Sequence, residues 1–311
     1  METQNYNLSL FLIFVGVLAA GLGVLRQIPS SQGFTSQVGG AFTENPQAVF
    51  VTTEEVLVQS KPLAREPLLP LNLQAASVLV KDLDSGILLF EKEPEKILPI
   101  ASLTKLMTAI VVYQNASPSE EITVTSQDTA TVPYRANFVP GQTFVVSDLL
   151  SAMLVSSAND AALALARHVG GTVERFVTEM NNTAQNLGMT ATHFTNPIGL
   201  DDPLHYSTAS DLARLVEEFL KYPEFLQIVR SPEVVINTVG KKARYRLLTT
   251  NKLMLVHPEI RGLKTGYTDE AKGNLIILTD RYYAILLGSR EREREMETLM
   301  DWLKENYSWE H

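Results

Sequence analysis

The sequence predicts an α+β fold, in which an antiparallel sheet from both chain ends lies beside a helical subdomain. Strand-like segments with β-branched residues occur near the start of the folded body, at 75–90, and again near its end, at 274–287. Segments with apolar residues at helical spacing fill the middle of the chain. Strands at both ends with helices between them indicate one sheet with helices packed on it.

Composition limits the class of protein. The chain has 311 residues, of which 45% are hydrophobic and 20% are charged, as expected for a globular protein with a sizeable core. A net charge of −9 argues against a nucleic-acid partner, because phosphate backbones require a basic surface. The absence of cysteine excludes disulfides, thiolate metal sites and a cysteine nucleophile, and it is compatible with an oxidising compartment.

An apolar run of about 18 residues, from Leu8 to Leu25, is just long enough to cross a bilayer. It is either a retained signal anchor or a cleaved signal peptide. No clear small-residue cleavage site follows, so we expect residues 1–26 to form a transmembrane signal anchor. No Lys or Arg precedes the run and Arg26 follows it, and this charge distribution by itself favours a body on the cytoplasmic side. Long domains translocate largely regardless of flanking charge, so we still expect the body on the outer side of the membrane.

The body follows a polar segment without sustained periodicity. Residues 27–72 are rich in Gln, Ser, Thr, Pro and Gly and are typical of a flexible linker. We expect the folded catalytic domain to span residues 73–305, with a short tail at 306–311.

Turn residues separate the elements expected within the body. Residues 75–82 and 87–90 form a hairpin around Asp84-Ser85-Gly86. Caps, periodicity and glycine stops predict helices at 102–113, 149–155, 161–169, 172–187, 211–220 and 290–303. Further strands are expected at 234–239, 274–279 and 282–287, whereas residues 122–143 give no clear pattern.

The first chemical motif is Ser102-Leu103-Thr104-Lys105. Residues i and i+3 of a helix share a face, so the Ser102 hydroxyl and the Lys105 amine come within hydrogen-bond reach. Serine is a weak nucleophile until a base takes its proton, and lysine can do so when burial lowers its pKa. An isolated motif of this kind is usually an N-cap serine with a solvated lysine, but the flanking residues here are apolar.

The second motif, Ser157-Ala158-Asn159, falls in the break between two apolar helices. Such a break is either a plain connecting turn or a functional loop held by rigid helices. As a site, Ser157 can relay a proton to a leaving amine and Asn159 can bind a substrate amide. Asp160 is expected only to cap the next helix.

The third motif is Lys264-Thr265-Gly266, followed by Tyr267. Alone it is most simply a turn with an exposed lysine. As an edge strand it can pair with the backbone of a peptide substrate, with Lys264 adding positive charge and Gly266 allowing close approach.

The three motifs in this order resemble those of serine-type D-Ala-D-Ala carboxypeptidases, the low-molecular-mass penicillin-binding proteins. The similarity covers roughly residues 73–305. It extends to the stretches around His193-Phe194-Thr195-Asn196-Pro197, His205-Tyr206-Ser207-Thr208-Ala209 and Thr250-Asn251-Lys252-Leu253. It implies the β-lactamase/transpeptidase-like fold.

The resemblance also implies roles for individual residues. Catalytic residues would be Ser102 as acyl-ester nucleophile, Lys105 as its proton acceptor, and Ser157. Backbone N–H groups of Ser102 and Tyr267 would form the oxyanion hole. Substrate-binding residues would be Asn159, Lys264, Thr265, Gly266, Tyr267 and Arg292, with Arg290 as the alternative to Arg292. No metal or organic cofactor is expected.

The implied reaction removes the terminal D-Ala from peptidoglycan stem peptides, with β-lactam antibiotics as covalent inhibitors. A DD-endopeptidase with the same site and a non-catalytic peptidoglycan-binding module are the alternatives. A β-lactamase is disfavoured, because we see no convincing carboxylate-bearing loop to activate a deacylating water. The implied location is a bacterial membrane, with the catalytic domain on its extracytoplasmic side.

Two features stand apart from the motifs. Ala271 is followed by Lys272 where the family usually has glycine, which adds a charge near the cleft. His193 and His205 lack metal-ligand spacing, so we expect structural, hydrogen-bonding histidines.

Overall fold

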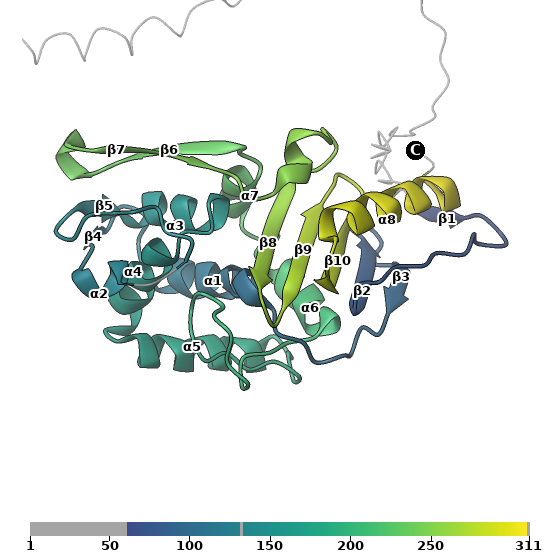
Figure 1. The fold of residues 1–311 in the computed structure, drawn as a ribbon, viewed down its shortest axis with the longest axis horizontal. Helices are drawn as coiled ribbons and strands as arrows, with labels where there is room; N and C mark the ends of the chain where they lie inside the picture. Colours follow the sequence, from purple (N-terminus) through teal and green to yellow (C-terminus); the bar gives the residue numbers. More distant parts are fainter. Residues whose placement is uncertain (1–60, 131–132, 310–311) are drawn as a thin grey trace, which may run out of the picture. The chain divides into compact units, whose positions relative to one another are not determined.

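One five-stranded antiparallel sheet joins strands from both ends of the folded body. The structure, a computed structural model, describes residues 61–130 and 133–309. The strand order is β3-β2-β10-β9-β8, so that the early hairpin lies against the late strands (Figure 1). The strands are β2 (Ser77–Asp82), β3 (Leu88–Lys92), β8 (Gly262–Thr268), β9 (Lys272–Leu278) and β10 (Tyr282–Ser289). The predicted α+β class and the shared sheet are confirmed.

Both faces of this sheet are covered, because its central strands are apolar on both sides. On β10, Ile285 and Leu287 contribute to the core shared with the helical subdomain. The alternate residues Ala284 and Leu286 pack with the C-terminal helix α8 (Arg292–Asn306). Successive strand side chains point to opposite faces, so a strand buried on both sides has a continuous apolar sequence.

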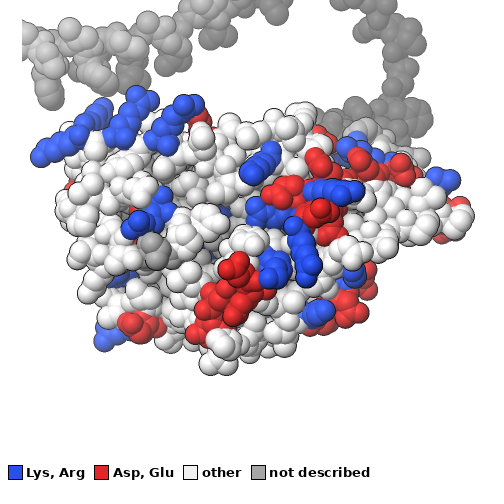
Figure 2. Space-filling model, in the orientation of Figure 1, with Lys and Arg blue, Asp and Glu red and all other residues white. Residues whose placement is uncertain are grey.

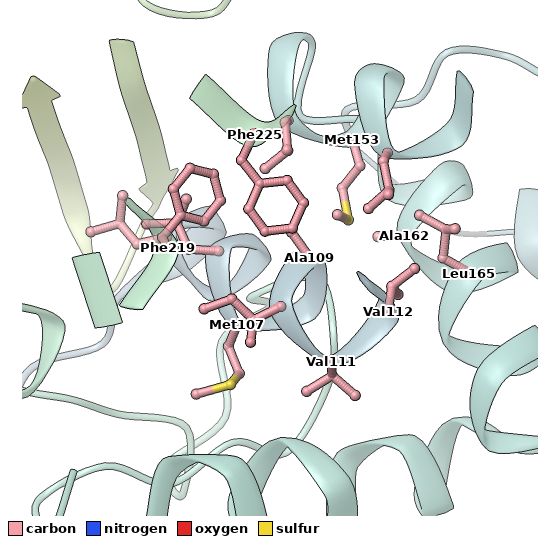
Figure 3. Close-up of a cluster of buried hydrophobic side chains, with 14 of the residues drawn as sticks. Met107, Ala109, Val111, Val112, Met153, Ala162, Leu165, Phe219 and Phe225 are labelled. Carbon is pink, nitrogen blue, oxygen red and sulfur yellow. The ribbon is translucent and has the colours of Figure 1, made fainter. Parts of the chain in front are cut away.

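Helix α1 (Lys105–Asn115) runs through the centre of the helical subdomain. Its residues from 105 to 112 are all buried. Figure 3 shows Met107, Ala109, Val111 and Val112 of α1 among side chains from the surrounding helices. The helices that surround α1 are α3 (Val146–Val155), α4 (Asn159–Gly170), α5 (Val173–Asn186), α6 (Ala209–Phe219) and α7 (Pro223–Val229). Each fully buried large apolar side chain contributes about 1.5–3 kcal/mol, which fixes α1 firmly.

Short elements complete the fold. Two short hairpins are β4 (Glu121–Thr123) with β5 (Thr143–Val145), and β6 (Glu233–Asn237) with β7 (Arg244–Leu248). The remaining helical turns are η1 (Ala101–Thr104), α2 (Ser126–Thr129), η2 (Val239–Lys241) and η3 (Lys252–Leu255). Of these elements the sequence predicted only β6, because three to five residues are too few to display a period.

The folded body extends beyond its predicted limits of residues 73 and 305. Strand β1 (Pro62–Ala64), placed in the predicted linker, pairs antiparallel with β11 (Tyr307–Trp309), placed in the predicted tail. Trp309 Nε1 donates to Asp82 Oδ2 at 2.7 Å, which ties the tail to the sheet. The predicted transmembrane segment lies outside the described residues. Within the described ranges, no helix is both long and apolar enough to cross a membrane.

Candidate active site

Ser102 lies in the 3-10 turn η1, which leads directly into α1. Lys105 begins α1, one turn further along, and its Nζ lies 3.0 Å from Ser102 Oγ. Lys105 is fully buried, whereas Ser102 is partly exposed. The i, i+3 spacing therefore brings hydroxyl and amine together, although the serine stands in a 3-10 turn and not in the predicted α-helix.

The environment of Lys105 favours a neutral amine. Burial holds the pKa of Lys105 well below its ordinary value, and the nearby Lys264 lowers it further, against an opposing effect of Asp160. Nζ lies 2.7 Å from both Asn159 Oδ1 and the Ile198 carbonyl. A neutral amine that donates its two N–H groups to these oxygens keeps its lone pair for the Ser102 hydroxyl.

A second serine–lysine pair lies across the cleft. Ser157, in the loop between α3 and α4, has a φ of 60°, and its Oγ accepts from Lys264 Nζ at 2.9 Å. Lys264 is buried on β8. Burial, followed by the charge of Arg292, lowers the pKa of Lys264 to about 7. Near neutral pH this lysine can therefore both donate and accept a proton.

Asn159 and Asp160 hold a loop that the sequence did not reveal. Asn159 Nδ2 donates to the Pro133 carbonyl at 2.7 Å, and its backbone N–H donates to the Tyr134 carbonyl at 2.8 Å. Asp160 is fully buried and accepts from the backbone N–H groups of Ala136 and Phe138 at 3.0 and 3.2 Å. The predicted capping role of Asp160 is wrong, because Ala158 is the N-cap of α4 and Asp160 lies inside the helix. Its carboxylate instead fixes the loop that carries Tyr134.

Strand β8 forms the opposite wall and is an edge of the sheet, as predicted. A Cβ on Gly266 would lie 3.0 Å from Ser102 N, tighter than ordinary contacts, so glycine permits the close approach of β8 to η1. Arg292 Nη1 donates to the Gly266 carbonyl at 2.7 Å. Thr265 Oγ1 donates to Thr250 Oγ1 at 2.7 Å.

These elements enclose one cleft. Its lining includes six residues predicted from sequence: Ser102, Ser157, Thr265, Gly266, Tyr267 and Arg292. Lys105, Asn159 and Lys264 are buried and contact one another or the two serines. Tyr134 and Thr250 also line the cleft and had no predicted role. The Thr250-Asn251-Lys252 stretch of the resemblance was the available signal for Thr250, whereas Tyr134 lies where the sequence gave no pattern.

Two expectations outside the motifs can be compared with the structure. His205 is buried beneath η1: its Nε2 lies 2.7 Å from Thr104 Oγ1, and its Nδ1 accepts from the Thr195 N–H at 3.1 Å. Burial lowers the pKa of His205 to about 4, consistent with a neutral structural histidine. Within residues 61–130 and 133–309, no cluster of three or more His, Asp or Glu is placed to hold a metal.

Lys272, the departure from the family pattern, lies at the β8–β9 turn. Its φ is 57°, a left-handed conformation that glycine adopts more easily, and its Nζ donates to the Asp269 carbonyl within the same turn. Arg290, the alternative to Arg292, is exposed.

Comparison with known proteins agrees with this geometry. A family model described as D-alanyl-D-alanine carboxypeptidase matches residues 63–285. The chain belongs to the D-alanyl-D-alanine carboxypeptidase family. The resemblance predicted from the motifs is thereby confirmed.

Members of this family give the extent of the similarity. D-alanyl-D-alanine carboxypeptidase DacF of Bacillus subtilis is 31% identical over 75% of this chain, which spans 63% of that relative's length. A D-alanyl-D-alanine endopeptidase of Pseudomonas aeruginosa is 35% identical over 67% of this chain and 67% of its own. The crystal structure of penicillin-binding protein D2 of Listeria monocytogenes, in its ampicillin-bound form, is 34% identical with a TM-score of 0.66, over 76% of this chain and 99% of that one. The predicted transpeptidase-like fold is confirmed.

Proposed function

We propose that this protein is a serine-type D-Ala-D-Ala carboxypeptidase that acts through an acyl-enzyme on Ser102. The observation that carries the proposal is the 3.0 Å contact between Ser102 Oγ, which lines the cleft, and the Nζ of a fully buried lysine. A partly exposed nucleophile beside a base with a lowered pKa is the arrangement that serine acyl transfer requires.

Acylation begins when Ser102 Oγ attacks the carbonyl carbon between the two D-alanines, as Lys105 takes the hydroxyl proton. The carbonyl oxygen becomes an oxyanion, for which we assign the backbone N–H groups of Ser102 and Tyr267 as donors. The close approach of β8 to η1 at Gly266 supports this assignment, because it brings the two segments together.

The second serine–lysine pair serves the leaving group. When the C–N bond breaks, the departing amine needs a proton, and Ser157 can supply it with Lys264 as its partner. The terminal carboxylate of the substrate is anionic, and Lys264, Thr265 and Arg292 offer two cations and a hydroxyl at the same wall. Asn159 positions Lys105 and holds the Tyr134 loop.

Water then completes the reaction by attacking the Ser102 ester. The proton that Lys105 took from Ser102 replaces the one given to the leaving amine by the Ser157–Lys264 pair, so Lys105 is neutral again when water attacks. Lys105 then takes a proton from this water and returns it to Ser102 Oγ as the C–O bond breaks, and the shortened peptide leaves as a carboxylic acid that ionises in solvent. A β-lactam would acylate the same serine, since its strained amide takes the place of the peptide bond.

A DD-endopeptidase is the second candidate. The endopeptidase of Pseudomonas aeruginosa is 35% identical to this chain, so a cross-linked peptide is a reasonable alternative substrate. The same catalytic residues would act on it.

The location follows from the sequence alone. We propose that residues 1–26 anchor the chain in a bacterial membrane with the catalytic body on the extracytoplasmic side. The apolar run from Leu8 to Leu25 supports the anchor, and a peptidoglycan substrate requires an extracytoplasmic site.

The test is D-alanine release from a pentapeptide ending in D-Ala-D-Ala, measured together with labelling by a fluorescent penicillin. The full-length chain should do both, and Ser102→Ala should do neither while it keeps its thermal unfolding transition. Labelling without release of D-alanine would favour the endopeptidase. Neither activity in the wild type would favour the non-catalytic binding module, and labelling of Ser102→Ala would refute the nucleophile.

A further inference from the structure

The β6–β7 hairpin and the turn after it form a basic surface on an acidic protein. Residues 230–256 contain six basic residues and one acidic residue, although the whole chain carries a net charge of −9. The basic residues are Arg230, Lys241, Lys242, Arg244, Arg246 and Lys252. Figure 2 shows Lys and Arg side chains lined up along the margin where Figure 1 places this hairpin. We call residues 230–256 the basic hairpin segment.

Five of these six cations are exposed and form no ion pair within the described chain, and three of the five lie close together in the sequence. Lys241, Lys242 and Arg244 are exposed, and no acidic side chain of the described chain forms an ion pair with any of them. Arg246, by contrast, pairs with Glu233. Lys241, Lys242 and Arg244 lie at the hairpin turn and the first residue of β7, and the other two exposed cations without an ion pair are Arg230 and Lys252.

The same segment exposes apolar side chains. Five of the fifteen large hydrophobic residues that are exposed in the described chain belong to it: Val235, Val239, Leu248, Leu255 and Val256. Leu255 and Val256 are the most exposed of these, at 63% and 67%. Basic and apolar groups that are exposed together are typical of surfaces that rest in a membrane interface.

The opposite face of the hairpin is fixed to the body. Ile236 is buried in the helical core, and Tyr245 and Leu247 pack against it. The Tyr245 hydroxyl donates to Gln142 Oε1 at 2.6 Å, and its ring contacts Phe138 edge-on. The exposed face is therefore presented on a rigid support.

We propose that the basic hairpin segment docks on the anionic headgroups of a lipid bilayer. Lysine and arginine near such a surface are attracted by its negative potential, and the exposed leucine and valines gain by entering the interface. A soluble polyanion would use the charges but leave the apolar side chains in water, so the combination favours a bilayer. With residues 8–25 in the same membrane, as proposed above, a weak surface contact suffices, because tethering raises its effective concentration.

Docking would also orient the cleft. Strand β7 leads directly to Thr250, which lines the cleft and accepts from Thr265. A hairpin resting on the membrane would hold this wall of the cleft near the bilayer surface.

The absence of cysteine allows a single-site probe. The full-length chain carrying Val239→Cys is labelled with an environment-sensitive fluorophore and reconstituted into vesicles that contain a spin-labelled lipid quencher. Vesicles of phosphatidylglycerol are compared with vesicles of phosphatidylcholine. The reference label is Glu179→Cys on α5, which lies at the opposite margin of the body in Figure 1.

We expect several-fold stronger quenching at position 239 in phosphatidylglycerol than in phosphatidylcholine, with none at position 179. About 0.5 M NaCl should abolish it, because the screening length then falls to a few ångströms. Combining Lys241→Ala, Lys242→Ala and Arg244→Ala should reduce quenching to the phosphatidylcholine level, whereas Lys241→Arg with Lys242→Arg should preserve it. Leu255→Ser with Val256→Ser should weaken it.

Three results would overturn the proposal. Equal quenching at position 239 in both lipids, or undiminished quenching in the triple alanine variant, would show that the basic side chains do not attract the hairpin to anionic headgroups. Equal quenching at positions 239 and 179 would indicate adsorption without a defined face. A response to soluble polyglutamate as large as that to vesicles would identify a soluble polyanion as the occupant instead of a bilayer.

Discussion

The two serine–lysine pairs of the cleft are assembled in different ways. Ser102 and Lys105 are three residues apart, and their 3.0 Å contact follows from one helical turn. Ser157 and Lys264 are 107 residues apart, and their 2.9 Å contact requires the α3–α4 loop to meet strand β8. The first pair is a property of a local segment, whereas the second exists only in the assembled domain.

What the pairs share is the cost of burial. Both lysines are almost fully buried, and neither forms an ion pair with an acidic side chain of the described residues. Burial lowers the pKa of each, and the charge of Lys264 adds to the effect on Lys105. A neutral amine is useful to catalysis but costs folding stability, a trade-off that is common at active sites.

The largest expected effect comes from removing the base of the local pair. Lys105→Ala should slow acylation by fluorescent penicillin by about 10²- to 10⁴-fold, because Ser102 then lacks its proton acceptor. Stopped-flow labelling gives the rate, and the exposed Lys96→Ala is the matched control. An acylation rate near that of the wild type would show that another group takes the proton.

The position of Ser102 in the Ser102–Lys105 pair also depends on a glycine that is distant in the sequence, Gly199. Gly199 has a φ of 84°, and a Cβ there would lie 2.0 Å from the Ala101 carbonyl oxygen, beside Ser102. Gly199→Ala should cost about 3 kcal/mol or more in unfolding free energy and should slow labelling.

Gly86→Ala is the control for backbone conformation. Gly86 has a φ of 68° but nothing within 4 Å of its added Cβ, so this change should cost only about 1–2 kcal/mol and leave labelling intact. Equal losses in the two variants would mean that the clash at Ala101 is unimportant.

Stability should depend on pH through Lys264 of the non-local pair. Its pKa is about 7 in the folded protein against 10.5 as an ordinary lysine, so between these values the unfolded chain binds the extra proton. Stability should therefore rise with pH above about 7, by at most about 1.4 kcal/mol per unit from this lysine.

Lys264→Met should remove that contribution. Urea unfolding of the variant between pH 7 and pH 9 should give a shallower rise of unfolding free energy with pH than the wild type, with the variant more stable at pH 7. Parallel profiles would contradict the lowered pKa. The exposed Lys252→Met is the control for loss of a lysine.

The smallest expected effect concerns Arg292, which links the second pair to the cleft wall. Its charge lowers the pKa of Lys264, so Arg292→Gln should raise that pKa. If protonated Lys264 serves acylation, kcat/KM should fall on the alkaline side with a midpoint near pH 7. In Arg292→Gln this midpoint should move to higher pH, and in Arg292→Lys it should return close to the wild-type value. An unmoved midpoint would assign it to another group.

Within the fold, sequence was sufficient for elements long enough to show a period. The hairpin β2–β3, the strands β9 and β10, and the helices α1, α3, α4, α5, α6 and α8 were predicted close to their observed positions. The prediction missed α7, because its seven residues are too few to display a clear period; it begins at Pro223, and proline is well tolerated in the first helical turn. It also missed β1 and β11, because each has only three residues and is a strand only through its antiparallel pairing with the other.

For the site, sequence alone determined which residue types are present and, through helical spacing, that Ser102 faces Lys105. Only the tertiary structure decided that Ser157 contacts Lys264 and that Asp160 fixes the Tyr134 loop. The same holds for the contact of His205 with Thr104, in the 3-10 turn that contains Ser102. Burial decides the lysine pKa values too, because desolvation depends on all the segments that surround a side chain. Periodicity reports contacts within one turn or strand, whereas contacts between distant segments form only when the chain packs.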